Sequence, residues 1–168
     1  YSRHNLSPET INLKKMILAI ISEFREQHSN ISYNVDFLTS PTSHDTTINR
    51  VLLEQAVKIL ITNATEALLA SPQTKPKIEI QVQINSYITI DIIDNGPGIP
   101  NSIQEQIFEH FYSTKSNGTG VGLSLIKRIC ESENGSIELI NTNCAMSNAS
   151  FPGAHFRYKT PNNNWAIQ

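Results

Sequence analysis

The sequence predicts an α+β two-layer sandwich, in which a mixed, mainly antiparallel sheet of about five strands is covered on one face by three helices. Three segments carry apolar residues at the helical period, and about five shorter segments alternate apolar and polar residues as half-buried strands do. The strands expected over 78–84 and 88–92 are separated by Asn85-Ser86, which predicts an antiparallel hairpin. This hairpin argues against a doubly wound parallel fold.

Each expected helix carries its apolar side chains on one stripe. The first is expected over residues 7–27 and the second over about 48–70, where Ser71-Pro72-Gln73 ends it. A third helix is expected over about 121–133, and a shorter one over 102–108.

The expected strands are short and are bounded by turn-forming residues. They cover residues 31–37, 78–84, 88–92, 136–140 and 154–159. Two further segments are predicted to lie outside regular structure: the polar segment 39–47, as a loop, and a frayed tail after about residue 161.

The composition is that of an ordinary globular domain. Hydrophobic residues make up 39% and charged residues 17%, which excludes collagen-like, coiled-coil and disordered chains, and the net charge of -2 argues against a nucleic-acid surface built on bulk positive charge. The two cysteines, Cys130 and Cys144, form no CxxC pair, so neither a disulfide framework nor a zinc site is predicted. No apolar run reaches the roughly 18 residues of a membrane span. We expect one domain over residues 1–168 in a reducing compartment, as a piece of a longer protein because the chain starts at Tyr1.

Two glycine-rich segments are the most informative feature of the chain. Asp94-x-Gly96-x-Gly98 sets a carboxylate at a strand end, followed by two positions at which the backbone can approach a ligand closely. Gly118-x-Gly120-x-Gly122 directly precedes a helix, where unpaired N–H groups and the helix dipole favour phosphate oxygens. Taken alone, each segment is also consistent with an ordinary loop or helix start.

Asn63 lies inside the second expected helix, beside its apolar stripe. Asparagine is a mediocre helix former, so its presence there needs a reason. One interpretation is a surface amide. The other is a side-chain oxygen offered to a cation bound to phosphates, because Mg²⁺ is often held by few protein oxygens plus the substrate.

Four motifs, occurring in order along the chain, carry a resemblance to a known family. They are Asn63-Ala64-x-Glu66-Ala67, Asp94-x-Gly96-x-Gly98, Ile107-Phe108-Glu109-x-Phe111 and Gly118-Thr119-Gly120-Val121-Gly122-Leu123. Together they resemble the asparagine, first glycine, phenylalanine and second glycine boxes of the sensor histidine kinase catalytic domain. That domain has the Bergerat-type ATP-binding fold, in a superfamily shared with gyrase, a heat-shock chaperone and mismatch-repair ATPases. The resemblance covers about residues 10–160, and Gly153-x-x-Phe156 resembles the family's closing motif.

The resemblance implies that the domain binds ATP and Mg²⁺. Asp94 would accept a hydrogen bond from the exocyclic amine of adenine, which discriminates against guanine because the guanine oxygen cannot donate. Asn63 would ligate the Mg²⁺ that bridges the phosphates, and backbone amides of the second glycine box would cradle the phosphates. The nucleotide-binding residues implied in this way are Asn63, Asp94, Gly96, Gly98, Ile99, Phe108, Thr114, Lys115, Gly118, Thr119, Gly120, Val121, Gly122 and Leu123.

The same resemblance implies that residues 100–118 form a lid over ATP. Phe108 and Phe111 would be its hinge, and the alternative is that both belong to the core. Lys115 resembles a lid lysine of nitrogen-sensor kinases, and with Asn63 it would be catalytic by neutralising negative charge on the γ-phosphoryl group. The alternative for Lys115 is a solvated loop lysine.

One position departs from the family pattern. Four residues before Asn63 the kinases usually have a second asparagine and the hydrolysing branches a catalytic glutamate, but this chain has Ile59. At about 100° per residue the two positions lie roughly 40° apart, so we expect Ile59 to face the same site as Asn63. An isoleucine can neither ligate Mg²⁺ nor deprotonate water.

The five histidines do not resemble the family's phosphoacceptor motif. We therefore expect the acceptor histidine on a separate dimerisation domain of the same kinase, with the phosphoacceptor and sensor domains outside residues 1–168. The implied function is transfer of the γ-phosphoryl group to that histidine, which then phosphorylates the receiver domain of a response regulator. The domain would work in the cytoplasm, attached or not to a membrane-anchored sensor, and would itself contact neither nucleic acid nor membrane.

Three alternatives stay open on the sequence. The first is an ATP-hydrolysing conformational switch of the same fold, against which Ile59 counts because it replaces the catalytic glutamate. The second is a nucleotide-binding pseudokinase or regulatory module, which Ile59 keeps open. The third is a protein-serine kinase of the anti-sigma type.

Overall fold

The computed structural model describes residues 7–39, 44–71, 74–109, 121–140 and 153–163. The elements in these residues are, in chain order, β1 (Glu9–Asn12), α1 (Leu13–Gln27), β2 (Ser32–Phe37), β3 (Asp45–Ile48), α2 (Arg50–Ala70), β4 (Lys77–Ile84), β5 (Tyr87–Asp94), the 3-10 helix η1 (Asn101–Ile103), α3 (Gly122–Ser132), β6 (Ser136–Leu139) and β7 (His155–Pro161).

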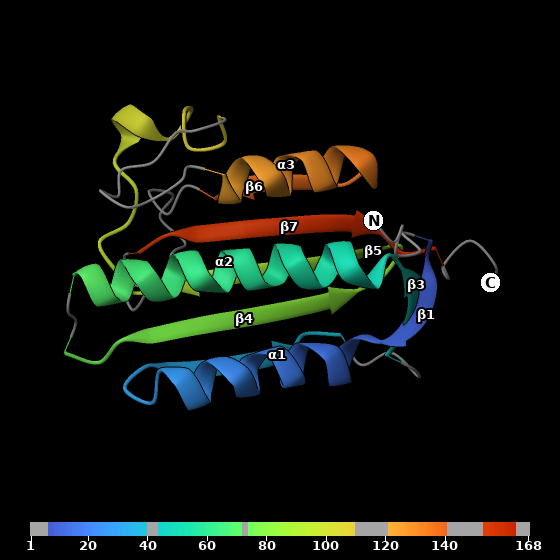
Figure 1. Cartoon of the computed structure of the whole chain (residues 1–168), viewed down its shortest axis with the longest axis horizontal. Helices are drawn as coiled ribbons and strands as arrows, with labels where there is room; N and C mark the ends of the chain where they lie inside the picture. Colours follow the sequence, from blue (N-terminus) through green and yellow to red (C-terminus); the bar gives the residue numbers. More distant parts are fainter. Residues whose placement is uncertain (1–6, 40–43, 72–73, 110–120, 141–152, 164–168) are drawn as a thin grey trace, which may run out of the picture.

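A layer of helices covers one face of the main sheet (Figure 1). Within the described residues the layer consists of α1, α2 and α3, and the sheet has five strands in the order β2-β4-β5-β7-β6. Strands β2 and β4 are parallel, whereas β4, β5, β7 and β6 pair in antiparallel fashion. The predicted α+β sandwich with a mixed, mainly antiparallel sheet is confirmed, and so is the hairpin at Asn85-Ser86.

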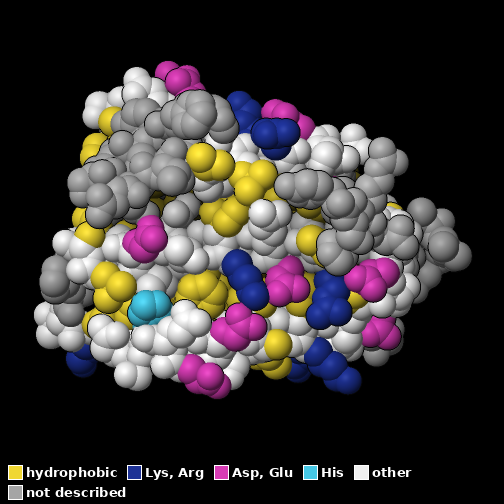
Figure 2. Space-filling view, viewed as in Figure 1, with side chains coloured by type: hydrophobic (Ala, Val, Ile, Leu, Met, Phe, Trp, Pro, Cys, Tyr) yellow, Lys and Arg dark blue, Asp and Glu magenta, His cyan; other side chains and the backbone are white. Residues whose placement is uncertain are grey.

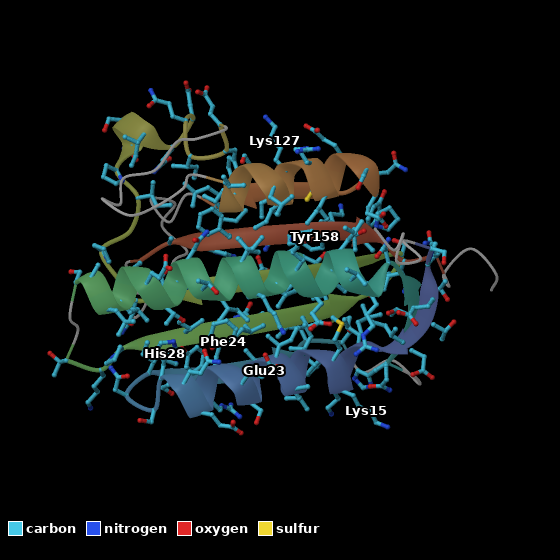
Figure 3. The ribbon with its side chains drawn as sticks, viewed as in Figure 1. Lys15, Glu23, Phe24, His28, Lys127 and Tyr158 are labelled. Atoms are coloured by element: carbon cyan, nitrogen blue, oxygen red, sulfur yellow. The ribbon has the colours of Figure 1, made fainter. Side chains whose placement is uncertain are left out.

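The hydrophobic core lies between the helices and the sheet. Along β4 and β5 every second side chain is buried, and Ile78, Ile80, Ile88 and Ile90 are fully shielded from solvent. Because successive side chains of a strand point to opposite faces, this alternation gives the sheet a single face for the helices to cover. Figure 3 shows Tyr158, also buried, on β7.

The N-terminal part of the fold differs from the helix predicted over residues 7–27. Residues 9–12 form β1, which pairs in antiparallel register with β3. Most of β3 lies in the segment 39–47, which was predicted as a loop. Asn12 ends the strand and caps α1, because its side-chain oxygen accepts a hydrogen bond from the Lys15 N–H at 3.0 Å. Its Nδ2 also donates to Asp45 at 3.0 Å. This small sheet depends on residues more than 30 positions apart, so local periodicity could not indicate it.

Two further predictions were wrong in detail. The helix expected over 102–108 is only the 3-10 turn η1, followed by turns. The side chain of Gln104 donates to the carbonyl of Ile99 and to Asn101, both at 2.9 Å, and such bonds compete with a regular helix. The second is the frayed tail expected after about residue 161. Pro161 belongs to β7 and Asn162 is buried, with its N–H donating to the carbonyl of Ser86 at 3.0 Å.

Helices α1 and α2 are joined at the surface by an ion pair of Lys58, which also pairs within α2. The Nζ of Lys58 lies 3.1 Å from a carboxylate oxygen of Glu23 and 3.0 Å from one of Glu54. Figure 2 shows basic and acidic side chains intermixed on this helical face. Such exposed pairs each contribute about 0–1 kcal/mol, so the buried side chains of α1 and α2 carry most of their packing energy. In the described part of the chain, no helix is both long and apolar enough to cross a membrane.

Candidate functional site

Asp94 is the last residue of β5, and only 3% of its surface is exposed. Its Oδ1 atom accepts hydrogen bonds from the backbone N–H of Gly96 at 2.8 Å and of Ala154 at 3.3 Å. The N–H of Asp94 in turn donates to the carbonyl of Ala154 at 3.0 Å. Among the described residues, donors reach this carboxylate at Oδ1 alone. Its Oδ2 atom therefore keeps its acceptor capacity for a ligand.

The environment of Asp94 also shifts the pKa of its carboxyl group. Burial raises the pKa of this carboxyl above its ordinary value, because a charged group is disfavoured away from water, and the N–H donors of Gly96 and Ala154 act in the opposite direction. A ligand that donated a hydrogen bond to Oδ2 would favour the charged form further. The carboxylate is thus suited to recognise an N–H group, such as the amine of a base.

Gly153 is essential to this arrangement. A Cβ atom at this position would lie 2.1 Å from Oδ1 of Asp94, 2.3 Å from its carbonyl oxygen and 2.6 Å from the backbone nitrogen of Gly96. Real Cβ atoms do not approach so closely, so only glycine allows β7 to begin beside the carboxylate. Gly153 was predicted only as part of a closing motif, because no local pattern indicates its contact with Asp94.

Asn95 holds the loop that follows β5, and the sequence analysis did not single it out. Its side-chain oxygen accepts a hydrogen bond from the N–H of Lys77 at 2.8 Å, and its Nδ2 donates to the carbonyl of Lys75 at 2.8 Å. The start of β4 and the end of β5 are therefore tied together next to Asp94. Within the loop Gly98 has a φ of 73°, a backbone conformation that side-chain-bearing residues rarely adopt.

Helix α2 contacts both glycine-rich segments. The Cγ2 atom of Ile59 lies 3.2 Å from the position that a Cβ on Gly122 would take, at the start of α3. Nearer the end of α2, a methyl group of Leu68 lies 3.5 Å from the corresponding position on Gly96. Asn63 lies between Ile59 and Leu68 along the helix axis and is half-buried. The amide of Asn63 thus lies on the helix that contacts both glycine-rich segments.

The N-terminus of α3 has the features of an anion site. The helix begins at Gly122 with Val121 as its N-cap residue, and an apolar Val side chain offers no acceptor to the first N–H groups. The first turn also carries no acidic side chain. Figure 2 shows hydrophobic side chains gathered where α2 and α3 face each other. A phosphate at this end of α3 would meet the positive end of the helix dipole.

Phe108 packs into the fold near the middle of the predicted lid. Its ring is half-buried and stands edge-on to that of Phe156 on β7, with the ring centroids 6.2 Å apart. The neighbouring Ile107 is buried, and Ile99 packs against the core from the loop after β5. This contact agrees with the interpretation of Phe108 as a core residue and also suits a hinge, since it anchors the segment to β7.

The structure therefore describes nine of the expected nucleotide-binding residues. It brings Gly96 against Asp94, Gly122 against Ile59, and Phe108 against Phe156 of β7. The other five lie outside the described residues, and so does Phe111. These five are Thr114, Lys115, Gly118, Thr119 and Gly120.

The residues present fit a magnesium nucleotide. Among the described residues no three His, Cys, Asp or Glu side chains gather as a metal site. Mg²⁺ needs no such cluster when phosphate oxygens and water complete its shell, and Asn63 supplies an amide oxygen of the kind it accepts. Within the described residues, the acceptor capacity left at Oδ2 of Asp94 and the N-terminus of α3, which has no side-chain cap, suit the base and the phosphates of the same ligand.

Comparison with known proteins agrees with this geometry. Residues 48–164 match the family model described as Histidine kinase-, DNA gyrase B-, and HSP90-like ATPase. The chain belongs to this family. The match covers α2, both glycine-rich segments and the start of β7, which are the parts that build the candidate site.

Curated relatives of this ATPase-family domain include a histidine-protein kinase and a sensor protein. AtoS, a signal transduction histidine-protein kinase from Escherichia coli K12, is 35% identical over 129 residues, which are 76% of this chain and 19% of AtoS. The sensor protein FixL from Bradyrhizobium diazoefficiens is 30% identical over 137 residues, which are 82% of this chain and 25% of FixL. The chain thus spans a quarter or less of these relatives.

Solved histidine kinase domains share the fold. The nucleotide-free catalytic domain of ThkA superposes with a TM-score of 0.75 at 24% identity, covering 92% of this chain and 95% of that domain. The mycobacterial sensor histidine kinase MprB superposes with a TM-score of 0.74 at 24% identity, covering 92% of this chain and 97% of the other. At this identity the likeness concerns the fold.

Proposed function

We propose that this domain binds Mg·ATP and transfers the γ-phosphoryl group to a histidine on a separate dimerisation domain, as the catalytic domain of a sensor histidine kinase. The observation that carries the proposal is the carboxylate of Asp94, which two backbone N–H groups hold at Oδ1 while Oδ2 remains available to an amine. The relationship to AtoS and FixL supports the kinase branch of the family.

In this proposal the base is recognised by Asp94. Its Oδ2 accepts a hydrogen bond from the exocyclic amine of adenine, whereas guanine would bring an oxygen against the carboxylate and leave both acceptors unpaired. Gly96 and Gly98 let the loop pass close to the base, and Ile99 lines it. The phosphates lie at the N-terminus of α3, at Val121, Gly122 and Leu123.

The metal is held in this proposal by the side-chain oxygen of Asn63. When bound, Mg²⁺ neutralises charge that develops on the phosphates during phosphoryl transfer. Because Ile59 offers no oxygen, α2 supplies one amide where the related kinases usually supply two. Lys115 and Thr114, together with Gly118, Thr119 and Gly120, belong to the same proposal as lid and phosphate-binding residues.

The acceptor is a histidine of the dimerisation domain, from which the group passes to a receiver domain. A neutral imidazole, with an ordinary pKa of about 6.5, carries a free lone pair at pH 7, so the domain needs to position it rather than deprotonate it. ThkA has been solved in complex with the response regulator protein TrrA, and ShkA with AMPPNP, which supports partners and ligands of these classes. We place the domain in the cytoplasm, where ATP is supplied.

A nucleotide-binding module without kinase activity is the second candidate, and the contact of Ile59 with Gly122 favours it over an ATP-hydrolysing switch. A general base contributes about 10²–10⁴ in rate, and an isoleucine cannot remove a proton from water. We therefore expect negligible ATP hydrolysis by this chain. Brisk release of phosphate from ATP would contradict both the proposed kinase function and the alternative of a nucleotide-binding module.

The binding part of the proposal is tested by calorimetry with ATP, ADP and GTP. The chain should prefer ATP and ADP over GTP, and Asp94→Asn should weaken both by roughly the 1.5–3 kcal/mol of a hydrogen bond to a charged group. Thr89→Val, on the opposite face of β5, is the matched control and should bind normally. Equal affinity for ATP and GTP would remove Asp94 from the base site.

The transfer part is tested with labelled ATP. The chain alone should form no acid-labile phosphate, because none of its five histidines lies in a phosphoacceptor motif. Addition of the dimerisation domain from the same protein should give phosphohistidine slowly. Normal ATP binding without any transfer would favour the nucleotide-binding module.

A further inference from the structure

A cluster of charged side chains lies on the sheet face opposite the helices. Asp91 of β5 lies between Ile90 and Ile92, which point into the core, so its side chain points to the other face. Although it lies on the uncovered face, Asp91 is only 3% exposed, because His155 and Arg157 of the neighbouring β7 cover it. The proposed phosphoryl transfer uses none of these three side chains.

The contacts in this cluster are short and use both carboxylate oxygens. The Nε2 atom of His155 lies 2.6 Å from Oδ1 of Asp91, and the Nε atom of Arg157 donates to the same oxygen at 2.9 Å. A second nitrogen of Arg157 donates to Oδ2 at 3.4 Å. Burial alone would raise the pKa of Asp91, but the hydrogen bonds and charges of His155 and Arg157 outweigh it and lower that pKa below its ordinary value.

The cluster adjoins the backbone contacts of Asp94 through His155. His155 is the first residue of β7 and pairs with Ile93 of β5. The next residues toward the site, Ala154 and Asp94, exchange the hydrogen bonds described above. Gly153 has no side chain and Ala154 has only a methyl group. Neither can anchor the start of β7 through a side chain, so the nearest side-chain anchor is the imidazole of His155.

We propose that His155 and Asp91 are positioning residues for the base site, acting from the opposite face of the sheet. By tying the first residue of β7 to β5, they hold the N–H of Ala154 against Oδ1 of Asp94. That donor orients the carboxylate so that Oδ2 is presented to the nucleotide. The inference rests on the proposed contact of Asp94 with adenine and adds the residues that maintain it.

His155→Leu tests this role, because it removes the tie while Asp91 stays paired with Arg157. We expect the affinity for ADP to fall about tenfold and the Ala154 amide to exchange with solvent about tenfold faster. The pKa of the Asp94 carboxyl, followed by carbon-13 NMR without nucleotide, should rise because a donor to its charged form is weakened. His155→Gln, whose amide can still donate to Asp91, should restore all three values toward those of the wild type.

Lys159→Leu is the matched control, on the same strand and face but at the far end. Lys159 lies over the ring of Tyr87, with its Nζ 4.1 Å from the ring centroid, so its loss disturbs the same two strands without touching Ala154. It should change none of the three values. If His155→Leu does not fold, Asp91→Asn replaces it, since the amide keeps the shape of the side chain and weakens both contacts.

The outcomes separate this inference from the proposed function. A folded His155→Leu or Asp91→Asn variant with unchanged exchange, Asp94 pKa and ADP affinity would overturn the inference. If exchange and the Asp94 pKa change while ADP affinity does not, the positioning is upheld and the contact of Asp94 with adenine is contradicted. An unaltered affinity in Asp94→Asn would point to the same failure independently.

Discussion

Ile59 of α2 lies against Gly122, the first residue of α3, with its Cγ2 atom 3.2 Å from the position that a Cβ on that glycine would take. The position one turn before Asn63 therefore contributes a methyl group to the junction of α2 and α3. In related domains it contributes a metal ligand or a base. Ile59 therefore packs against the start of α3 and, in the proposed function, would also bear on metal binding and hydrolysis.

Ile59→Asn is expected to tighten Mg·ATP binding about threefold or more, because it restores a second amide oxygen near Asn63. Calorimetry with Mg²⁺ and with a chelator should show the gain only when the metal is present. Ile59→Val is the control, since it keeps the apolar contact with Gly122 and adds no oxygen. Neither variant should hydrolyse ATP, and a gain that persists in chelator would assign the effect to packing instead.

Asn63→Ala is expected to remove the dependence of ATP binding on Mg²⁺. The affinities with metal and with chelator should become equal. Adenosine should bind almost as it does to the unmodified chain, because in the proposed function the base contacts Asp94 and not Asn63. Thr62→Ala, at the exposed position next to it on α2, is the control. A Mg²⁺ dependence that survives in Asn63→Ala would mean that the metal is held by other groups.

Gly153→Ala is expected to weaken nucleotide binding more than tenfold and to lower the melting temperature. Its methyl group would overlap Oδ1 of Asp94 at 2.1 Å, so either the carboxylate or the start of β7 must move. Gly135→Ala provides a matched control, since its Cβ would lie 2.4 Å from the carbonyl oxygen of Lys159, away from Asp94. It should cost stability with little direct effect on affinity. Equal loss of affinity in both variants would argue for a general effect on the fold.

The raised pKa of Asp94 predicts a dependence on pH. Its ordinary value is 3.8, and burial moves it upward. As the pH falls through the raised pKa, the carboxylate becomes protonated, and its hydrogen bond with adenine loses the contribution of the negative charge. ATP affinity should therefore begin to fall above pH 3.8. The affinity of the unmodified chain is compared with that of Asp94→Asn at each pH. The phosphates of ATP titrate in the same way with both chains, so their contribution to the difference cancels. An affinity difference between the two chains that stays constant down to pH 3.8 would contradict the shift.

The same shift has a consequence for stability with the opposite sign. A buried carboxyl whose folded-state pKa is raised binds its proton more tightly in the folded chain, so it favours folding as the pH falls from the raised value toward 3.8. Above the raised pKa its burial in charged form costs stability. Urea unfolding over this range should show the contribution in the unmodified chain and lack it in Asp94→Asn. Other carboxylates contribute equally to both chains and cancel.

Much of this protein follows from local sequence patterns. The apolar stripe of α2, the alternation along β4 and β5, and the turn at Asn85-Ser86 depend on neighbours within a few residues, and each was predicted from them. The motifs around Asn63 and Asp94 likewise identified the family. Local periodicity predicted the wrong structure at β1 and at η1. Strand β1 forms because the distant β3 pairs with it, and at η1 the side chain of Gln104 competes for a backbone carbonyl group.

Only the tertiary structure decided how the site is held. The hydrogen bond between Ala154 and Asp94 joins residues 60 positions apart, and the close approach of Gly153 and the Asp91–His155 pair depend on the same antiparallel pairing of β5 with β7. No pattern in the chain specifies which residue will lie opposite Asp94, because the register of two distant strands follows from the burial of their apolar faces. The sequence by itself therefore determined the family and the residues proposed to carry the chemistry, and packing determined which residues lie against Asp94.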